Sequence, residues 1–346
     1  MNASLTPVVM PVAELRSWCS DVLERHGQST RNAEVAAEVL VRTTARGFRS
    51  HGVDLLPMYA TWMRSRAVVG DATPEVVHSA GATAVIEAHG ALGQVAGMIA
   101  MGVAGDLARE HGIGLAVVRG SNHAGALGHY VLTEAERGRM AIAWSSAPPT
   151  IHAPGGHGRL IGNGPTAYGV PRAGEPPLVF DAAMSVGAGG KAAQARARGE
   201  DLPEGWILDR DGSPSTDPAD AVEGSFVPVG AHKGFGLALL AEVLSSCLAG
   251  APLSGDLPRL QPPPEHPFGM GHAFLAIDAA HFGTDLAAET ARLSQLVRDS
   301  PVADGETAVV TPGDRAHRRE QDALRDGISF DGATWARLDA LRTGTS

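Results

Sequence analysis

The stretch Ile113-Gly-Leu-Ala-Val-Val118, followed by Arg119-Gly-Ser-Asn-His-Ala-Gly-Ala-Leu-Gly-His-Tyr130, decides how we interpret the whole chain. Its first six residues are apolar and partly β-branched, which predicts a buried strand. A polar turn with Asn122 and His123 follows, and then a segment compatible with a helix. Such turns carry function in α/β enzymes, because they expose backbone N–H groups at a strand end. Alone, this stretch favours a surface turn in which Asn122 caps a helix and His123 is solvated.

Helix and strand patterns alternate along the rest of the chain and predict an α/β fold, without settling the order of the strands. Residues 251–268 contain six prolines and are expected to form a loop. Helices are expected at 12–23, 30–46, 94–111, 237–248, 286–297 and 335–341, and strands at 76–77, 83–86, 140–144, 178–183 and 271–279.

The composition of the chain limits the classes of molecule that it is expected to bind. The 346 residues suggest about two domains. A net charge of −10 and an aromatic content of 5% argue against a nucleic-acid partner or an anionic membrane surface. The sequence contains neither an apolar run of membrane-spanning length nor a signal-peptide pattern at its N-terminus. We therefore expect a cytoplasmic protein that acts on small molecules.

Common catalytic signatures are missing from the sequence. Gly187-Ala-Gly-Gly-Lys191 lacks the spacing of a dinucleotide fingerprint, and Ala192 cannot serve as the magnesium ligand of a phosphate loop. The histidines show no metal-ligand spacing, so we expect no metal, and no serine-nucleophile elbow is present. What remains are polar residues at the ends of elements, which suggest acid–base chemistry without identifying a substrate: Ser50, His51, His123, Asp181 and Lys233.

Several motifs in a fixed order carry a family resemblance. They are Arg46-Gly-x-x-Ser-His-Gly-Val53 with Pro57 and Tyr59, Ser121-Asn-His-x-Gly125 with Tyr130, 206–218, His232-Lys-Gly-Phe-Gly-Leu237 and Gly271-His-x-Phe-x-x-Ile-Asp278. Together they resemble the malate/L-lactate dehydrogenase family of NAD(P)-dependent oxidoreductases, which includes enzymes similar to sulfolactate and ureidoglycolate dehydrogenases and piperideine-2-carboxylate reductase. The resemblance covers nearly the whole chain, from about residue 12 to Gly313.

This resemblance implies a non-Rossmann NAD(P)-binding fold of the L-sulfolactate dehydrogenase-like type. A central α/β cofactor domain, approximately 76–284, would be flanked by a helical domain built from 1–75 and 285–346. The enzyme would be a homodimer that uses NADH or NADPH.

The resemblance also implies roles for individual residues. His51 would be the general acid/base, Ser50 and Asp181 its relay partners, and His123 the rival for proton transfer. The segments expected to line the cofactor are His123 to Leu127 (with Ala124, Gly125 and Ala126), the loop with Asn163 and Pro165, and Lys233-Gly234-Phe235.

Three departures from the family pattern concern the substrate and the cofactor loop. Leu55 stands where the family usually has a carboxylate-binding arginine, and Gly164 stands where it has an asparagine. Arg49 replaces a common acidic residue and, with Arg46, is a candidate to bind the substrate instead. We therefore expect a larger or less anionic 2-oxo/2-hydroxy acid, or a cyclic imine. The alternative is a redox-inactive family member that acts as a binding or scaffolding protein.

Overall fold

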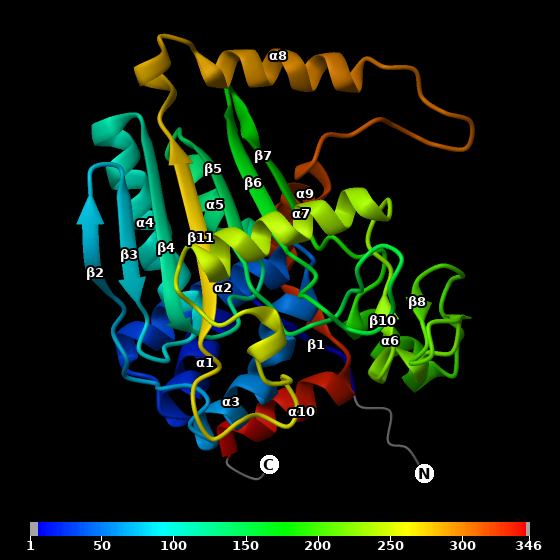
Figure 1. Cartoon of the computed structure of the whole chain (residues 1–346). Helices are drawn as coiled ribbons and strands as arrows, with labels where there is room; N and C mark the ends of the chain where they lie inside the picture. Colours follow the sequence, from blue (N-terminus) through cyan, green and yellow to red (C-terminus); the bar gives the residue numbers. More distant parts are fainter. Residues whose placement is uncertain (1–5, 344–346) are drawn as a thin grey trace.

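A seven-stranded sheet with the order β2-β3-β4-β11-β5-β6-β7 forms the centre of the computed structural model, which describes residues 6–343 (Figure 1). Only β3 and β4 run parallel, and the other neighbours are antiparallel. The strands are β2 (Glu75–Ala80), β3 (Thr83–Glu87), β4 (Ile113–Ser121), β5 (Met140–Ser145), β6 (Thr166–Arg172), β7 (Glu175–Ala182) and β11 (Met270–Ile277). The predicted α/β class is confirmed.

Two helices, α4 (Gly93–His111) and α5 (Gly128–Glu136), cover one face of the sheet. Small side chains on the strands allow this close packing. A Cβ atom added at Gly114 of β4 would lie 2.1 Å from the carbonyl oxygen of Ala104 in α4. Because α4 ends at Gly112, whose φ is +84°, the chain turns directly into β4 and delivers the polar segment at the far end of that strand.

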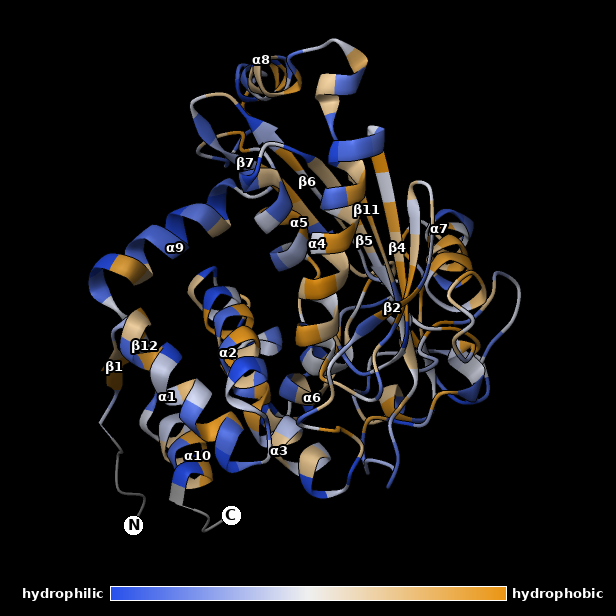
Figure 2. Ribbon diagram, turned by 90° about the vertical axis from the view of Figure 1, so that its left-hand side faces the viewer, coloured by the Kyte–Doolittle hydropathy of each residue, from blue (hydrophilic) through white to orange (hydrophobic). Residues whose placement is uncertain are grey.

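Segments from both ends of the chain pack together beside α4 (Figure 2). Strand β1 (Val8–Met10) pairs with β12 (Ile328–Phe330), and α10 (Gly332–Thr343) contacts α1 (Val12–Arg25) and α3 (Leu56–Arg64). Ser29 caps α2 (Thr30–Ala45), as predicted. Helix α9 (Asp314–Asp326) contacts α2, whereas α8 (Leu286–Arg298) lies against β6 of the central sheet.

The opposite face of the sheet carries α7 (His232–Glu242) and a π-helical turn (Val243–Cys247), which leave much of that face open (Figure 2). A small lobe beside it contains α6 (Gly189–Arg198), β8 (Ile207–Leu208), β9 (Pro214–Ser215) and β10 (Ser225–Phe226). Short 3-10 turns occur at Arg49–His51, Val53–Leu55, Asp220–Val222, Ser254–Asp256 and Ala279–Phe282. The sequence patterns did not predict α3, α9, β6 or β12.

Candidate active site

Ser50 and His51 lie in the 3-10 turn that follows α2. Thr44 in the last turn of α2 holds this segment, because its Oγ1 accepts a hydrogen bond from the Val53 N–H at 3.0 Å. Ser50 Oγ lies 3.0 Å from His51 Nδ1, which leaves Nε2 available for a ligand. Desolvation lowers the pKa of His51 below its usual 6.5, so the accessible ring is neutral at pH 7.

His123 follows β4 and lies beside His51. The two imidazole rings are stacked, with 6.0 Å between centroids and 30° between planes. Tyr59 of α3 places its hydroxyl 2.9 Å from His123 Nδ1, and the Trp62 ring meets the imidazole edge-on. Burial, His51 and His272 lower the pKa of His123 to about 3. The structure thus brings both predicted histidines together, with His51 exposed and His123 half-buried.

The turn that carries His123 is anchored in the core by Asn122. Its Nδ2 donates to the carbonyl oxygens of Gly90 and Ala91 at 2.7 and 2.9 Å, and its Oδ1 accepts from the Phe268 N–H at 3.2 Å. Asn122 is completely buried. The expectation of a helix-capping asparagine in a surface turn is therefore wrong, because partners remote in sequence saturate its side chain.

His272 of β11 also anchors this turn, through its contacts with two serine side chains. Its Nε2 lies 2.9 Å from Ser121 Oγ, and its Nδ1 lies 2.9 Å from Ser145 Oγ. Burial lowers the pKa of His272 to about 4, so the ring is neutral and serves as a fixed bridge between β4 and β5. The motif that contains His272 was noted in the sequence, but nothing there indicated these partners.

Asp181 lies at the end of β7 and accepts a hydrogen bond at 2.7 Å from the Gly128 N–H, at the start of α5. Desolvation by the atoms packed around the carboxylate raises the pKa of Asp181 to about 6, although the residue is exposed at the sheet edge, and the bond from Gly128 opposes this rise. Within residues 6–343, neither histidine of the pair forms a hydrogen bond with Asp181. A role of Asp181 as a relay partner of His51 thus stays a prediction.

The segment 124–127 links β4 to α5 and runs beside the histidine pair. Gly125 has a φ of +71°, and a Cβ atom there would lie 3.5 Å from the carbonyl oxygen of His51. Ala124 and Leu127 are buried, and Ala126 is half-buried. The first group of expected cofactor residues therefore adjoins His51 directly.

The other expected cofactor residues lie in the loop before β6 and in the first turn of α7, and backbone hydrogen bonds connect these two segments. The backbone carbonyl oxygen of Asn163 accepts a hydrogen bond at 2.7 Å from the Met184 N–H. The Met184 carbonyl oxygen in turn accepts one from the Val229 N–H, shortly before α7. A Cβ atom at Gly164 would lie 2.4 Å from the Ala238 Cα, so this departure from the family pattern fits close packing against α7. Pro165 completes the loop, and Lys233, Gly234 and Phe235 form the first turn of the helix.

Both arginines expected near the substrate are occupied by carboxylates. Arg46 is buried and pairs with Glu320 of α9 at 2.6 Å. Arg49 makes two hydrogen bonds to Asp54 and one to the Ser329 carbonyl oxygen. Leu55 packs against the apolar core of the terminal helices. A role of Arg46 or Arg49 in binding the substrate stays a prediction, and it is disfavoured because both guanidinium groups already pair with carboxylates.

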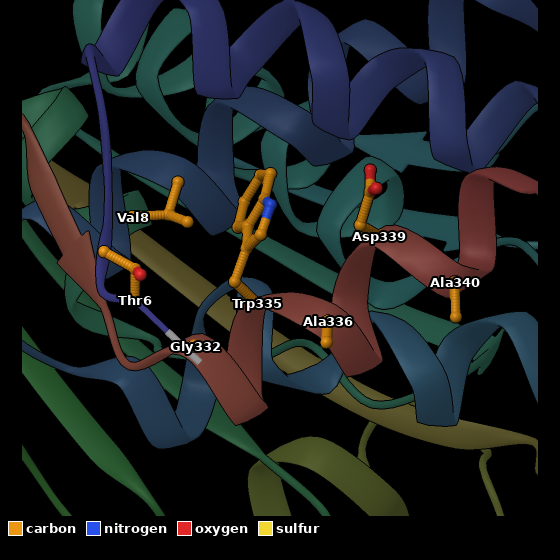
Figure 3. Close-up of a pocket in the computed structure, with 7 residues that line it drawn as sticks. All are labelled: Thr6, Val8, Gly332, Trp335, Ala336, Asp339 and Ala340. Atoms are coloured by element: carbon orange, nitrogen blue, oxygen red, sulfur yellow. The ribbon is translucent and has the colours of Figure 1, made fainter. Parts of the chain in front are cut away.

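Other features of the described chain carry no comparable chemistry. Across residues 6–343, no group of three or more metal-binding side chains gathers, and none of the helices is long and apolar enough to cross a membrane. A cavity of about 430 Å³ between β1 and α10 is lined by Thr6, Val8, Gly332, Trp335, Ala336, Asp339 and Ala340 (Figure 3). None of the expected site residues lines it.

Comparison with known proteins shows similarity to oxidoreductases along most of the chain. The profile of the malate/L-lactate dehydrogenase family matches residues 10–339. The chain is 38% identical over 317 residues to a (2R)-3-sulfolactate dehydrogenase (NADP(+)) from Chromohalobacter salexigens, which spans 90% of this chain and 92% of that protein. It is 32% identical over 325 residues to a Delta(1)-pyrroline-2-carboxylate/Delta(1)-piperideine-2-carboxylate reductase from Pseudomonas putida, with 94% of each chain covered. The sulfolactate dehydrogenase structure from Methanocaldococcus jannaschii superimposes with a TM-score of 0.88 at 29% identity, over 97% of each chain.

Proposed function

This chain belongs to the malate/L-lactate dehydrogenase family, and we propose that it transfers a hydride between a nicotinamide cofactor and a 2-oxo/2-hydroxy acid or cyclic imine carboxylate, with His51 moving the proton. The chain is an oxidoreductase, as its family and relatives are. The observation that carries the proposal is the stacked pair of His51 and His123, 6.0 Å apart. One small substrate can contact both rings.

His51 is the better of the two histidines for proton transfer. Its ring is accessible and Ser50 occupies Nδ1, so Nε2 can exchange a proton with a substrate heteroatom. Burial, His51 and His272 lower the pKa of His123 to about 3, so this ring takes up a proton less readily than the accessible ring of His51. This contrast supports the assignment that the family resemblance implies.

The described residues fit a phosphate-bearing nicotinamide cofactor, whose nicotinamide supplies or accepts the hydride. Helix α7 starts at His232 without a side-chain cap, and the Lys233 side chain is exposed there. An uncapped helix N-terminus with a lysine suits an anionic group. NADPH is our first choice, because the relative from Chromohalobacter salexigens is named for NADP(+).

We propose a substrate with a single carboxylate, either a larger 2-oxo acid or a cyclic imine. The arginines near the site are paired with Glu320 and Asp54, and Leu55 supplies no charge. The relative that reduces Delta(1)-piperideine-2-carboxylate supports this class. A 3-sulfolactate-like hydroxy acid is the second candidate, favoured by the 38% identity to the enzyme named for it.

Two measurements test the proposal. Titration with NADPH and with NADH, followed by fluorescence or calorimetry, should give saturable binding of at least one of them. The enzyme is then mixed with NADPH or NADH and each of a panel of 2-oxo acids, sulfopyruvate and cyclic imine carboxylates. Oxidation of the reduced nucleotide, followed by its absorbance, should identify the substrates. Binding of neither nucleotide would refute the enzyme's proposed cofactor class, and turnover of malate or lactate alone would refute the substrate class.

We also propose that the enzyme is a homodimer whose copies meet at α7. Its side chains Leu237, Leu239 and Leu240 are 46–53% exposed. The neighbouring sheet face is apolar too, with Leu115 and Leu275 only half-buried. Exposed apolar surfaces of this kind mark interaction sites, and a second copy offers a surface of the same character.

A further inference from the structure

The side chains of Gln94, Tyr59 and His123 are linked by hydrogen bonds behind the site. Gln94, in the first turn of α4, donates from Nε2 to the Tyr59 hydroxyl at 2.8 Å. The same hydroxyl lies 2.9 Å from His123 Nδ1. Gln94 and Tyr59 are fully buried, and neither belongs to the residues that the sequence assigned a catalytic role.

The hydrogens available for these hydrogen bonds determine which ring nitrogen of His123 carries the proton. A tyrosine hydroxyl has one hydrogen, and its oxygen already accepts from Gln94. Among the hydrogen-bond partners of Tyr59 within residues 6–343, His123 Nδ1 is the one that can accept the hydroxyl hydrogen. A hydrogen on Nδ1 would leave the buried Tyr59 hydrogen unpaired, which is unfavourable, so Nδ1 accepts it with a lone pair. A neutral imidazole that accepts at Nδ1 carries its proton on Nε2.

We propose that Gln94 and Tyr59 are positioning residues that keep the His123 proton on Nε2, so that this nitrogen donates a hydrogen bond to the substrate while His51 moves the proton. The inference rests on the proposed function for its chemistry. His123 Nε2 has no hydrogen-bond partner within residues 6–343, and it is absent from the buried atoms that lack one, so it faces accessible space. A donor there can stabilise the oxygen or nitrogen on which negative charge grows during reduction.

One further observation agrees with a fixed, neutral donor, and one defines the competing arrangement. Burial and the neighbouring His51 lower the pKa of His123 to about 3, which opposes a second proton on the ring. Gln94 Oε1 is buried without a hydrogen-bond partner within residues 6–343. Because an unpaired buried acceptor is unfavourable, the turned amide is the competing arrangement of this side chain. Here, turning the amide to satisfy Oε1 with the Tyr59 hydroxyl would force the His123 proton onto Nδ1.

The test is NMR of protein labelled with 15N-histidine, in which His123→Asn identifies the His123 signals. We expect an unprotonated Nδ1 and a protonated Nε2 that do not change between pH 6 and pH 8.5. Gln94→Glu replaces the donor by a carboxylate that accepts from Tyr59, so the proton should move to Nδ1. Tyr59→Phe should leave a mixture of both tautomers. Tyr130→Phe removes an equally buried hydroxyl that donates to the Ala124 carbonyl oxygen and should leave the His123 signals unchanged.

Kinetics provide the second readout. Tyr59→Phe should lower kcat roughly tenfold, and Gln94→Glu roughly 100-fold, with little change in the Kd of the nicotinamide nucleotide. A His123 that titrates between pH 6 and pH 8.5, or carries its proton on Nδ1 in the unmodified protein, would overturn the proposal. Unchanged tautomers in Gln94→Glu would do the same. The NMR result needs neither cofactor nor substrate, so failure of the proposed role of Gln94 and Tyr59 and failure of the proposed function are distinguishable.

Discussion

The imidazole of His51 lies 6.0 Å from that of His123, ring centre to ring centre, with the planes 30° apart. His51 is exposed and has Ser50 at Nδ1, whereas His123 is half-buried and its Nδ1 is bonded to the buried Tyr59 hydroxyl. Because the surroundings of the two rings differ, these two histidines, which are neighbours in space, are suited to different tasks. His51 is suited to proton transfer and His123 to hydrogen bonding.

Replacing His51 should abolish most turnover without loss of cofactor. A positioned acid or base accelerates a reaction by roughly 10²–10⁴, so His51→Ala should lower kcat by that factor while the Kd of NADPH stays within about twofold. His78→Ala, on the exposed strand β2, is the matched control. Unchanged kcat in His51→Ala would contradict the assignment. Since desolvation lowers the pKa of His51 below 6.5, hydroxy-acid oxidation, which needs the neutral ring, should be constant above pH 6.5 and decline in acid.

Asp181 should make stability depend on pH between about 4 and 6. Its folded pKa of about 6 exceeds the ordinary 3.8, so the folded state binds more protons than the unfolded state in this range. Stability therefore falls as the pH rises from 3.8 to 6. Asp181→Asn, which still accepts from Gly128, should have a higher Tm than the unmodified protein at pH 8 and an equal one near pH 4. Asp71→Asn, in an exposed loop, should show no such difference.

Gly164 should not tolerate a side chain. A Cβ atom there would lie 2.4 Å from the Ala238 Cα, and its φ of +52° also disfavours alanine. Overpacking of this kind costs about 1–3 kcal/mol. Denaturant unfolding of Gly164→Ala should show at least that loss. Gly102→Ala in α4, where nothing lies within 4 Å of the added Cβ, should be neutral or stabilising by up to about 1 kcal/mol. Equal stabilities of the two variants would contradict the packing argument.

Leu55→Arg should shift the substrate preference towards dicarboxylates. A charge-assisted hydrogen bond to a carboxylate contributes about 1.5–3 kcal/mol, so the KM for malate should fall roughly tenfold or more. Leu55→Met serves as the control for altered packing against the terminal core, which Leu55 contacts. The prediction fails if the KM for malate is the same in both variants although their Tm values show that both are folded.

Leu240→Lys should separate the proposed dimer. Its side chain is 47% exposed on α7, where a charge would be desolvated by a second copy. Light scattering after size exclusion should give the mass of a dimer for the unmodified protein and that of a monomer for the variant. Leu296→Lys on α8 changes a 69% exposed leucine outside this surface and should remain dimeric. A monomeric unmodified protein would refute the proposal.

Local sequence patterns predicted much of this protein without tertiary information. The run 113–118, the capped helix after Ser29 and the hairpin of β2 and β3 all form where periodicity and turn residues indicated. The ordered motifs also identified the family, which the match over residues 10–339 confirms. These signals lie within a few residues of one another, so a single sequence displays them directly.

The environment of the site was decided only by the tertiary structure. Asn122 is bonded to Phe268, His272 joins Ser121 to Ser145, and Gln94 reaches His123 through Tyr59. Likewise, only the fold shows that Arg46 is paired with Glu320. The bonded residues are separated by 35 to 274 positions, as the packing of β11 between β4 and β5 and of α9 on α2 requires. A sequence states which side chains can donate or accept a hydrogen bond, but burial and distance determine which of them meet, and those contacts set the protonation of each histidine.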